Sequence, residues 1–297
     1  MSYSENVPVL LTRHIRKLRG GSQPILAAAN DGRLYVVKFN NNLQGPNLAF
    51  NESMGTELYR LCNLPVPSWT PILVTGSFLD ENPGCWIETA DGKLRPEEGL
   101  CFGSRFLCGE NCRLLEILPG NSFKRVRNLC DFWLAWLLDI CAGHADNRQA
   151  IFHQKPNGIL DAFFIDHGHM FGGPKGECRV HFKAARYLDV RAYPDVSSKL
   201  VTTLRESTAS IDPDQLWLRA RGLPEDWKTV PALSKFAEAL ETLSKARLIN
   251  NAIETMFDSL RRTSGIEIDD NQWGGPAAGS VLRLGIQAAG LRRPFIH

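Results

Sequence analysis

Short apolar runs separated by polar breaks dominate the first hundred residues, a pattern typical of β-strands. Residues 25–29 and 34–39 form two such runs, and an Asn-Asp-Gly step at 30–32 separates them. Asn, Asp and Gly tolerate the positive φ of tight turns, so the two runs predict a β-hairpin. The segment Arg-Gly-Gly-Ser-Gln-Pro at 19–24 precedes it, so a glycine-rich loop leads directly into the first strand.

Lys38 lies near the end of the second strand, between Val37 and Phe39. A lone amine in apolar surroundings is costly unless it meets an anion, so Lys38 is a candidate anion ligand. The alternative is an edge-strand lysine whose stem lies along the sheet. In the same way, Gly20-Gly21-Ser22 could be an ordinary turn instead of a binding loop.

A helix is predicted at 49–61, where Phe50, Met54 and Leu58 recur at helical spacing. Glu52, near its start, is the candidate partner of Lys38. Glu57 on the same helix is a second possibility, and either carboxylate could instead belong to a solvated face. Further strands are predicted at 70–78, 84–89 and 100–107.

The pattern becomes helical from about residue 114 to 142, and residues 132–138 are apolar on every side, as in a helix at the centre of a domain. Two later helices are predicted near 199–204 and 232–261. From residue 263 the chain contains many Gly and Pro residues, and we expect this tail to be partly disordered.

Two carboxylates flank a second predicted hairpin, whose strands are 150–153 and 159–165. Asp146 precedes the first strand and Asp166 follows the second, so both emerge at the same end. They could share one cleft, where Mg²⁺ would screen their repulsion. Alternatively, Asp146 caps a strand and Asp166 begins a turn. We expect His144 to order the loop by hydrogen bonding, not to act as a base.

Composition limits the remaining classes of function. The 297 residues are 43% hydrophobic and 22% charged, with a net charge of +2, so binding to nucleic acid or membrane through net charge is not indicated. The apolar stretch 132–140 is too short to span a bilayer and contains Asp139. The N-terminus lacks the pattern of a secretory signal, which predicts a cytoplasmic protein.

The eight cysteines are scattered along the chain. The closest pair, Cys108 and Cys112, has no second pair and no histidine nearby at zinc-ligand spacing. Buried or inert thiols are therefore predicted, with a zinc site as the minor alternative.

The order of these parts suggests a function. A glycine loop, a strand lysine and a helix glutamate precede two acidic loops, which is the order of parts in a kinase. In phosphoryl transfer, loop amides and a lysine hold the phosphates and a glutamate orients the lysine. One aspartate handles the attacking hydroxyl and another holds the metal. The combination and its order are more specific than any one of these residues.

The chain resembles the HipA-like kinases, and specifically their short stand-alone bacterial branch. The matching segments are residues 19–24, 35–39, 51–52, 102–104, 145–150 and 165–168. The resemblance implies an α+β, two-lobed, protein-kinase-like fold with ATP between the lobes. The β-rich N-lobe would span 1–110, the mainly helical C-lobe 111–262 and the tail 263–297.

The resemblance also implies roles for individual residues. Lys38 would hold phosphates together with the loop Gly20, Gly21 and Ser22, and Glu52 would brace Lys38. Asp146 would be the catalytic carboxylate and Asp166 the ligand of Mg²⁺. Kinases of this type usually place an Asn five positions after the catalytic Asp to hold a second metal. Here that position is Ile151, and Gln149 is the candidate replacement.

The sequence therefore predicts an ATP- and Mg²⁺-dependent kinase that phosphorylates Ser or Thr of a protein. A nucleotide-binding pseudokinase with a regulatory or scaffolding role is the alternative from a different class. A kinase of a small molecule or lipid is a third reading, since one fold supports many acceptors. The sequence does not identify the acceptor, because acceptor specificity in kinases depends on loops that share no common sequence motif.

Overall fold

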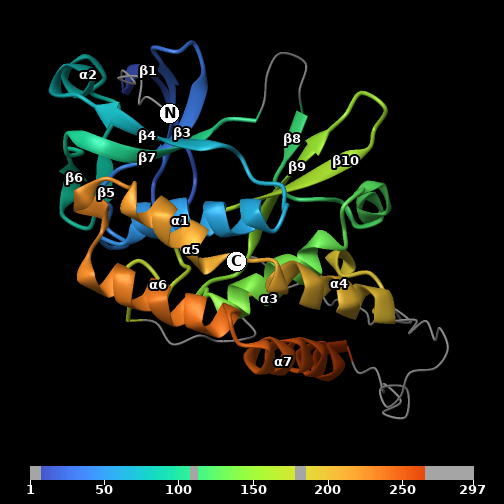
Figure 1. Cartoon of the computed structure of the whole chain (residues 1–297). Helices are drawn as coiled ribbons and strands as arrows, with labels where there is room; N and C mark the ends of the chain where they lie inside the picture. Colours follow the sequence, from blue (N-terminus) through green and yellow to red (C-terminus); the bar gives the residue numbers. More distant parts are fainter. Residues whose placement is uncertain (1–7, 108–112, 178–184, 265–297) are drawn as a thin grey trace.

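The computed structural model describes residues 8–107, 113–177 and 185–264. The protein has mixed α and β structure, and Figure 1 shows most strands in the upper part of the view and most helices below them. The predicted boundary at residue 110 lies outside the described residues. Of the predicted tail 263–297, only residues 263–264 are described, and they belong to the last helix.

Five strands close into a barrel in the order β1-β2-β3-β7-β4. Their bounds are Val9–Lys17, Ile25–Ala29, Leu34–Lys38, Gly99–Arg105 and Trp69–Val74. β1 and β4 pair in parallel, whereas the other neighbours are antiparallel. Fully buried side chains, among them Ile25, Val37 and Ile72, fill the barrel core. The predicted β2–β3 hairpin is confirmed, and Gly32 in its turn has φ +76°.

Two predicted strands are shorter than expected. The strand predicted at 70–78 ends at Val74, because Thr75 caps a short helix, α2 (Gly76–Glu81), by accepting a 3.2 Å hydrogen bond from the Phe78 amide. The strand predicted at 84–89 is only β5 (Ile87–Thr89), which pairs with β6 (Gly92–Leu94) in a small separate hairpin.

The predicted helix at 49–61 is confirmed as α1 (Leu48–Leu61), which is buried from Leu48 to Tyr59. The second predicted hairpin is confirmed as β9 (Gln149–Gln154) and β10 (Leu160–Ile165). Their register pairs Gln149 with Ile165, so the chain enters β9 and leaves β10 at the same end. β8 (Arg113–Leu115) adds a third strand beside β9.

The helical pattern, with polar breaks, predicted from 114 to 142 is confirmed only in its last part. Residues 113–115 form β8, and a 3-10 helix covers Gly120–Arg125. An α-helix, α3, begins only at Asp131 and ends at Cys141. Leu114 pairs with His153 across the sheet, and the Pro119-Gly120 step interrupts any helix through this region. Tertiary pairing and turn residues therefore overrode the apolar spacing.

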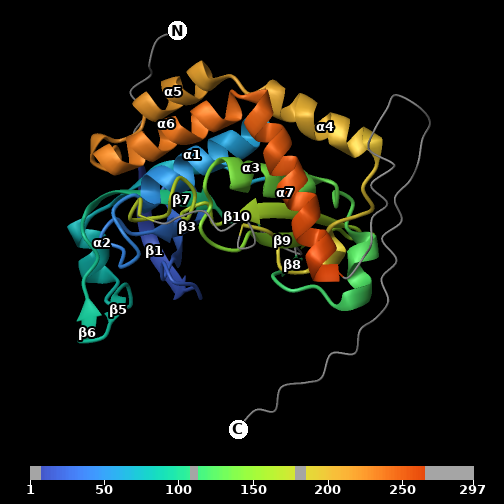
Figure 2. The same cartoon turned by 90° about the horizontal axis from the view of Figure 1, so that it is seen from below.

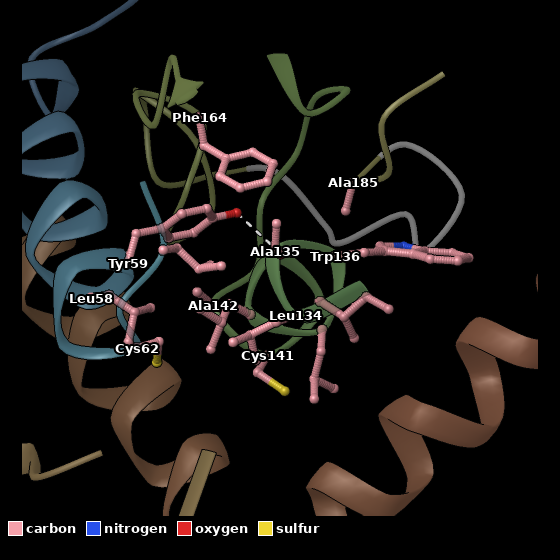
Figure 3. Packing of buried hydrophobic residues seen from close by; sticks show 14 of the residues in the cluster. Leu58, Tyr59, Cys62, Leu134, Ala135, Trp136, Cys141, Ala142, Phe164 and Ala185 are labelled. Atoms are coloured by element: carbon pink, nitrogen blue, oxygen red, sulfur yellow. Dashed lines mark hydrogen bonds between the residues drawn. The ribbon is translucent and has the colours of Figure 1, made fainter. Parts of the chain in front are cut away.

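α3 is the predicted central helix, since residues 132–141 are all buried. Figure 3 shows Tyr59 of α1 and Phe164 of β10 beside Ala135 of α3. The Tyr59 hydroxyl lies 3.0 Å from the Ala135 carbonyl oxygen and 2.8 Å from Asp139 Oδ1. This contact fastens α1 to the centre of the helical part.

The C-terminal helices are α4 (Ser198–Ala209), α5 (Pro213–Arg221), α6 (Val230–Leu243) and α7 (Ala246–Ser264). The single helix predicted at 232–261 is wrong. The helix is interrupted at residues 244–245, and α7 then runs in a new direction. Figure 2 shows α7 crossing α3, and α7 contacts α3, α4 and α6. Within the described residues, no helix is both long and apolar enough to cross a membrane.

Candidate active site

A cleft of about 1010 Å³ brings together segments that are far apart in the sequence. Its walls come from the glycine loop, β3, α1, the loop before β9 and the loop after β10. Most of the residues predicted for the site line it: Gly20, Ser22, Lys38, Glu52, Asp146, Gln149 and Asp166. Gly21 belongs to the same loop but is not among the lining residues.

Lys38 lies at the end of β3 and is only 8% exposed. Its ammonium donates to Glu52 Oε1 and, at 2.8 Å, to Asp166 Oδ1. Burial opposes the charge on Lys38, but Asp166 and Glu52 together raise its pKa above the usual value. An ammonium has three donors, so one remains for a further acceptor in the cleft.

Glu52 joins the barrel to the loop that follows β10. Its Oε2 accepts from the His167 amide at 3.1 Å, and its Oε1 accepts from the Gly168 amide at 2.9 Å as well as from Lys38. Burial raises the pKa of Glu52, and the ion pair with Lys38 opposes that rise. The carboxylate is therefore fixed in orientation on both of its oxygens.

Glu57, the alternative partner of Lys38, faces other residues. It accepts from Trp69 Nε1 at 2.9 Å and pairs with Arg219 of α5 at 2.7 Å. Glu52, the partner that the sequence analysis named for Lys38, is therefore the one that contacts it, and Glu57 is not.

Asp166 follows β10 with φ +62°, a left-handed conformation that Asp adopts more readily than most residues. This turn directs its carboxylate toward Lys38, and its Oδ2 accepts a 2.9 Å hydrogen bond from Gln149 Nε2. Burial opposes ionisation, but Lys38 overrides it and holds the pKa of Asp166 well below its usual range. Asp166 is therefore a carboxylate at neutral pH, the form that binds Mg²⁺.

Asp146 lies in the loop between α3 and β9, half-buried in the wall of the cleft. Its Oδ1 accepts from the Asn147 amide at 2.7 Å. Asp146 and Asp166 lie at the same end of the β9–β10 hairpin and line the same cleft, which is the arrangement that the sequence predicted.

His144 connects the two acidic loops. Its Nδ1 lies 2.6 Å from the Asp146 carbonyl oxygen, and its Nε2 lies 3.4 Å from the Asp166 carbonyl oxygen. Burial and the nearby Arg148 lower the pKa of His144, so the ring is neutral and carries one proton. Nδ1 also lies 3.3 Å from the Asp146 amide nitrogen, so it donates to the Asp146 carbonyl or accepts from the Asp146 amide, according to which ring nitrogen carries the proton. His144 orders the backbone here, in agreement with the prediction.

Arg148 and Asp139 form a buried ion pair that the sequence analysis did not identify. It stabilises both the loop before β9 and the loop after β10. Arg148 Nε donates to Asp139 Oδ2 at 2.8 Å, and Nη1 donates to the Ile165 carbonyl oxygen at 2.8 Å. The guanidinium also lies over the Tyr59 ring, 5.0 Å from its centroid. Asp139 is charged within an apolar helix and so required a partner, which was the signal available in the sequence.

The glycine loop presents free backbone amides. Gly20 has φ +137°, and the Gln23 amide closes the turn by donating to the Gly20 carbonyl at 3.0 Å. Among the residues that the structure describes, the amides of Gly20, Gly21 and Ser22 have no hydrogen-bond partner. Successive unpartnered amides in a turn form the kind of concavity that binds phosphate.

The groups that line the cleft fit a nucleoside triphosphate together with Mg²⁺. The loop amides and the third donor of Lys38 match phosphate oxygens, and Asp166 offers an ionised carboxylate. Across the described ranges, no cluster of three or more His, Cys, Asp or Glu residues forms a metal cage. Mg²⁺ is normally held by one or two carboxylates together with substrate phosphates, so a cage is not required.

Of the five cysteines in the described residues, four have the predicted buried position. Cys62, Cys85, Cys101 and Cys141 are buried, and Cys130 is exposed. Burial raises the pKa of Cys62 and of Cys141 to about 12, so these thiols are unreactive at neutral pH. Cys108 and Cys112 lie outside the described residues.

Comparison with protein-family models and with curated protein sequences found no match. Among solved structures, a Golgi casein kinase is similar with a TM-score of 0.47 and 13% identity, over 85% of this chain and 72% of that one. The Helicobacter pylori proinflammatory kinase CtkA has a TM-score of 0.47 and 11% identity, over 82% and 96%. The Golgi casein kinase with Mn/ADP bound has a TM-score of 0.45 and 12% identity, over 86% and 74%. Because each TM-score lies below 0.5, these likenesses carry no conclusion about the activity of this chain.

Proposed function

We propose that the protein is an ATP- and Mg²⁺-dependent phosphotransferase that phosphorylates Ser or Thr of a protein, in the manner of the HipA-like kinases. One observation carries the proposal. The Lys38 ammonium is braced by Glu52 and lies 2.8 Å from Asp166, in a cleft that Asp146 also lines. Kinases of the protein-kinase type use a Lys–Glu pair, a metal-binding Asp and a catalytic Asp together in one cleft.

Each residue has a distinct role in this proposal. The free amides of Gly20–Ser22 and the third donor of Lys38 bind phosphate oxygens. Glu52 holds Lys38 in position. Its carboxylate also accepts hydrogen bonds from the amides of His167 and Gly168, which keeps the neighbouring Asp166 close to Lys38. Mg²⁺, when bound, neutralises charge on the phosphates, and Asp166 is its proposed ligand. Asp146 accepts the proton of the acceptor hydroxyl.

The test is transfer of labelled γ-phosphate from ATP in the presence of Mg²⁺, to the protein itself and to proteins of a cell lysate. Asp146→Asn should abolish transfer and leave nucleotide binding largely intact, because Asp146 acts on the acceptor. Asp166→Asn should weaken metal-dependent nucleotide binding. Asp226→Asn, at an exposed position between α5 and α6, is the matched control and should retain both.

Equal loss of binding in Asp146→Asn and Asp166→Asn would overturn these roles. Phosphate that appears on lipid or on small metabolites, with none on protein, would replace the protein acceptor with one of those classes.

A nucleotide-binding pseudokinase is the second candidate, and a specific observation favours it. Ile151, at the position where related kinases carry a metal-binding Asn, lines the cleft with an apolar side chain. Gln149, the proposed replacement, directs its amide nitrogen toward Asp166. Tight binding of ATP without any transfer would support this candidate over the active kinase.

A further inference from the structure

The side chain of Gln23 attaches the glycine loop to the β5–β6 hairpin. Gln23 follows Ser22 in the loop, and its Nε2 donates to the Glu88 carbonyl oxygen at 2.8 Å. In return, the Glu88 amide donates to Gln23 Oε1 at 2.7 Å. The Gln23 side chain thus satisfies both backbone groups of one β5 residue, as a neighbouring strand would.

Neighbouring charges reinforce this attachment. Lys17 Nζ lies 3.4 Å from Gln23 Oε1 and 3.2 Å from Glu88 Oε1, so it contacts both partners. The Trp86 ring, just before β5, has Lys17 Nζ 5.1 Å and Lys93 Nζ 3.8 Å from its centroid. The Lys17 contact holds the base of the hairpin against the end of β1, and the Lys93 contact lies within the hairpin.

The loop is also held from its other side. Asn42, in the segment between β3 and α1, donates through Nδ2 to the Ser22 carbonyl oxygen. Asn42 Oδ1 in turn accepts from the Gln44 amide at 2.9 Å, which fixes the Asn42 side chain. The loop is therefore held at two neighbouring residues, at Ser22 by Asn42 and at Gln23 by Glu88.

Gln23 itself adopts an unfavourable backbone conformation. Its φ of +46° is uncommon for a residue other than Gly, Asn or Asp, and this conformation carries an energetic cost. The two hydrogen bonds to Glu88 offset that cost. Gln23 does not line the cleft, although Ser22 and Pro24 on either side of it do. Its side chain therefore acts on the loop and not on the ligand.

We propose that the β5–β6 hairpin is a clamp that holds the glycine loop in its phosphate-binding shape through Gln23. Gln23 is then a positioning residue for the nucleotide phosphates. This inference rests on the proposed function, because it assigns the loop amides to ATP. A loop ordered in advance does not have to lose its conformational freedom on binding, so the clamp should strengthen nucleotide affinity.

The decisive variant is Gln23→Gly. Glycine adopts positive φ without strain, so the backbone shape stays accessible and only the clamp is removed. We expect the KM and the Kd for ATP to rise about tenfold, equivalent to about 1.4 kcal/mol, with kcat changed less than twofold. Amide hydrogen exchange of residues 19–24, measured without nucleotide, should become faster in the variant than in the wild type.

Asn63→Gly is the matched control. Asn63 is exposed, follows α1 and has a similar φ of +57°, but it lies away from the cleft. Its replacement should leave nucleotide affinity and exchange in the loop unchanged. If Gln23→Gly melts far below the wild type, nucleotide affinity and hydrogen exchange are compared between Gln23→Glu and the wild type instead. Gln23→Glu keeps an acceptor for the Glu88 amide but has no donor for the Glu88 carbonyl.

The outcomes separate the clamp from the proposed function. Failure of the wild type to bind ATP would overturn both. If the wild type binds ATP and Gln23→Gly binds it equally well, or if exchange in the loop is unchanged, the clamp alone is wrong. If Gln23→Gly lowered kcat and left the KM for ATP unchanged, that result would also contradict a role in positioning the nucleotide phosphates.

Discussion

Arg148 and Asp139 form the most deeply buried ion pair beside the candidate site, with side chains 1% and 0% exposed. Removal of one partner leaves an uncompensated charge in the interior, so Arg148→Ala should lower the free energy of unfolding by about 3–5 kcal/mol. Because Arg148 does not contact the Asp166 carboxylate, the Mg²⁺ dependence of any activity should stay the same. Denaturant unfolding and a Mg²⁺ titration measure the two effects.

Lys245→Ala provides the control for Arg148→Ala. Lys245 pairs with Glu241 one helical turn away on an exposed surface, where solvent screens the attraction. Its loss should leave the unfolding curve nearly unchanged. If the two variants were equally stable, Arg148 would not anchor the acidic loops.

Gln149 can act in two ways, as a donor that orders Asp166 or as a ligand of a second metal. If its amide oxygen holds that metal, Gln149→Ala should lower turnover more than tenfold, about 1.4 kcal/mol of transition-state stabilisation, with a smaller effect on ATP affinity. Steady-state kinetics over a range of Mg²⁺ concentrations measure both quantities.

Gln149→Glu separates the two roles. Glutamate retains an oxygen ligand for a metal but loses the hydrogen bond to Asp166 Oδ2, and it adds a like charge beside that carboxylate. Turnover recovered at high Mg²⁺ would support the metal role. Full activity of Gln149→Ala with an unchanged Mg²⁺ titration would rule that role out.

At the scale of elements, local patterns predicted local structure well. The β2–β3 hairpin, α1 and the β9–β10 hairpin are as expected, because turn residues and apolar spacing act within about 15 residues. The placement of Asp146 and Asp166 on one cleft followed from the second hairpin alone. These elements carry most of the candidate site.

Elements that depend on distant partners were not predicted. β1 contains Arg13, His14 and Arg16 and shows no clear alternation, yet pairing with β2 and β4 closes the barrel through it. The sequence named Glu52 as the partner of Lys38, but the amides that fix its carboxylate lie 115 and 116 residues further along the chain. No local pattern contains that information.

α1 packs so closely on the loop after β10 that a glycine is required at the contact. A Cβ on Gly55 would lie 2.5 Å from His167 Cβ and 2.6 Å from Met170 Sδ. Gly55→Ala favours the helix by about 1 kcal/mol, but the overlap costs about 1–3 kcal/mol, and α1 must move away from the loop. We therefore expect lower stability and weaker nucleotide binding, measured by denaturation and calorimetry.

Gly76→Ala is the control at the first residue of α2. There an added Cβ meets only the flexible carboxylate of Glu98. The variant should be as stable as the wild type or slightly more so. Unchanged stability and binding in Gly55→Ala would show that α1 can shift without disturbing Glu52.

At the scale of the whole molecule, contacts along the edge of the cleft join the barrel to the helices. Trp227, between α5 and α6, donates through Nε1 to the Leu100 carbonyl oxygen of β7 at 3.0 Å. Trp69 of β4 lies between Trp227 and Phe102, and Phe102 borders the cleft. The cleft itself is lined both by barrel residues, such as Lys38 of β3, and by residues of the loop before β9, such as Asp146, so a ligand there would contact both parts.

This arrangement predicts that ATP with Mg²⁺ stabilises the entire fold. A ligand that binds only the folded state adds about 2.7 kcal/mol at a hundredfold excess over its Kd, so the Tm should rise by several degrees. Removal of Mg²⁺ with a chelator should reduce the shift, because Asp166 would then repel the phosphates without a cation between them. Thermal unfolding with ATP alone, Mg²⁺ alone and both together measures each contribution. Asp166→Asn removes that repulsion, so its shift should depend much less on Mg²⁺ than the wild-type shift. If no nucleotide changed the Tm of the wild type, neither a kinase nor a nucleotide-binding pseudokinase could be maintained.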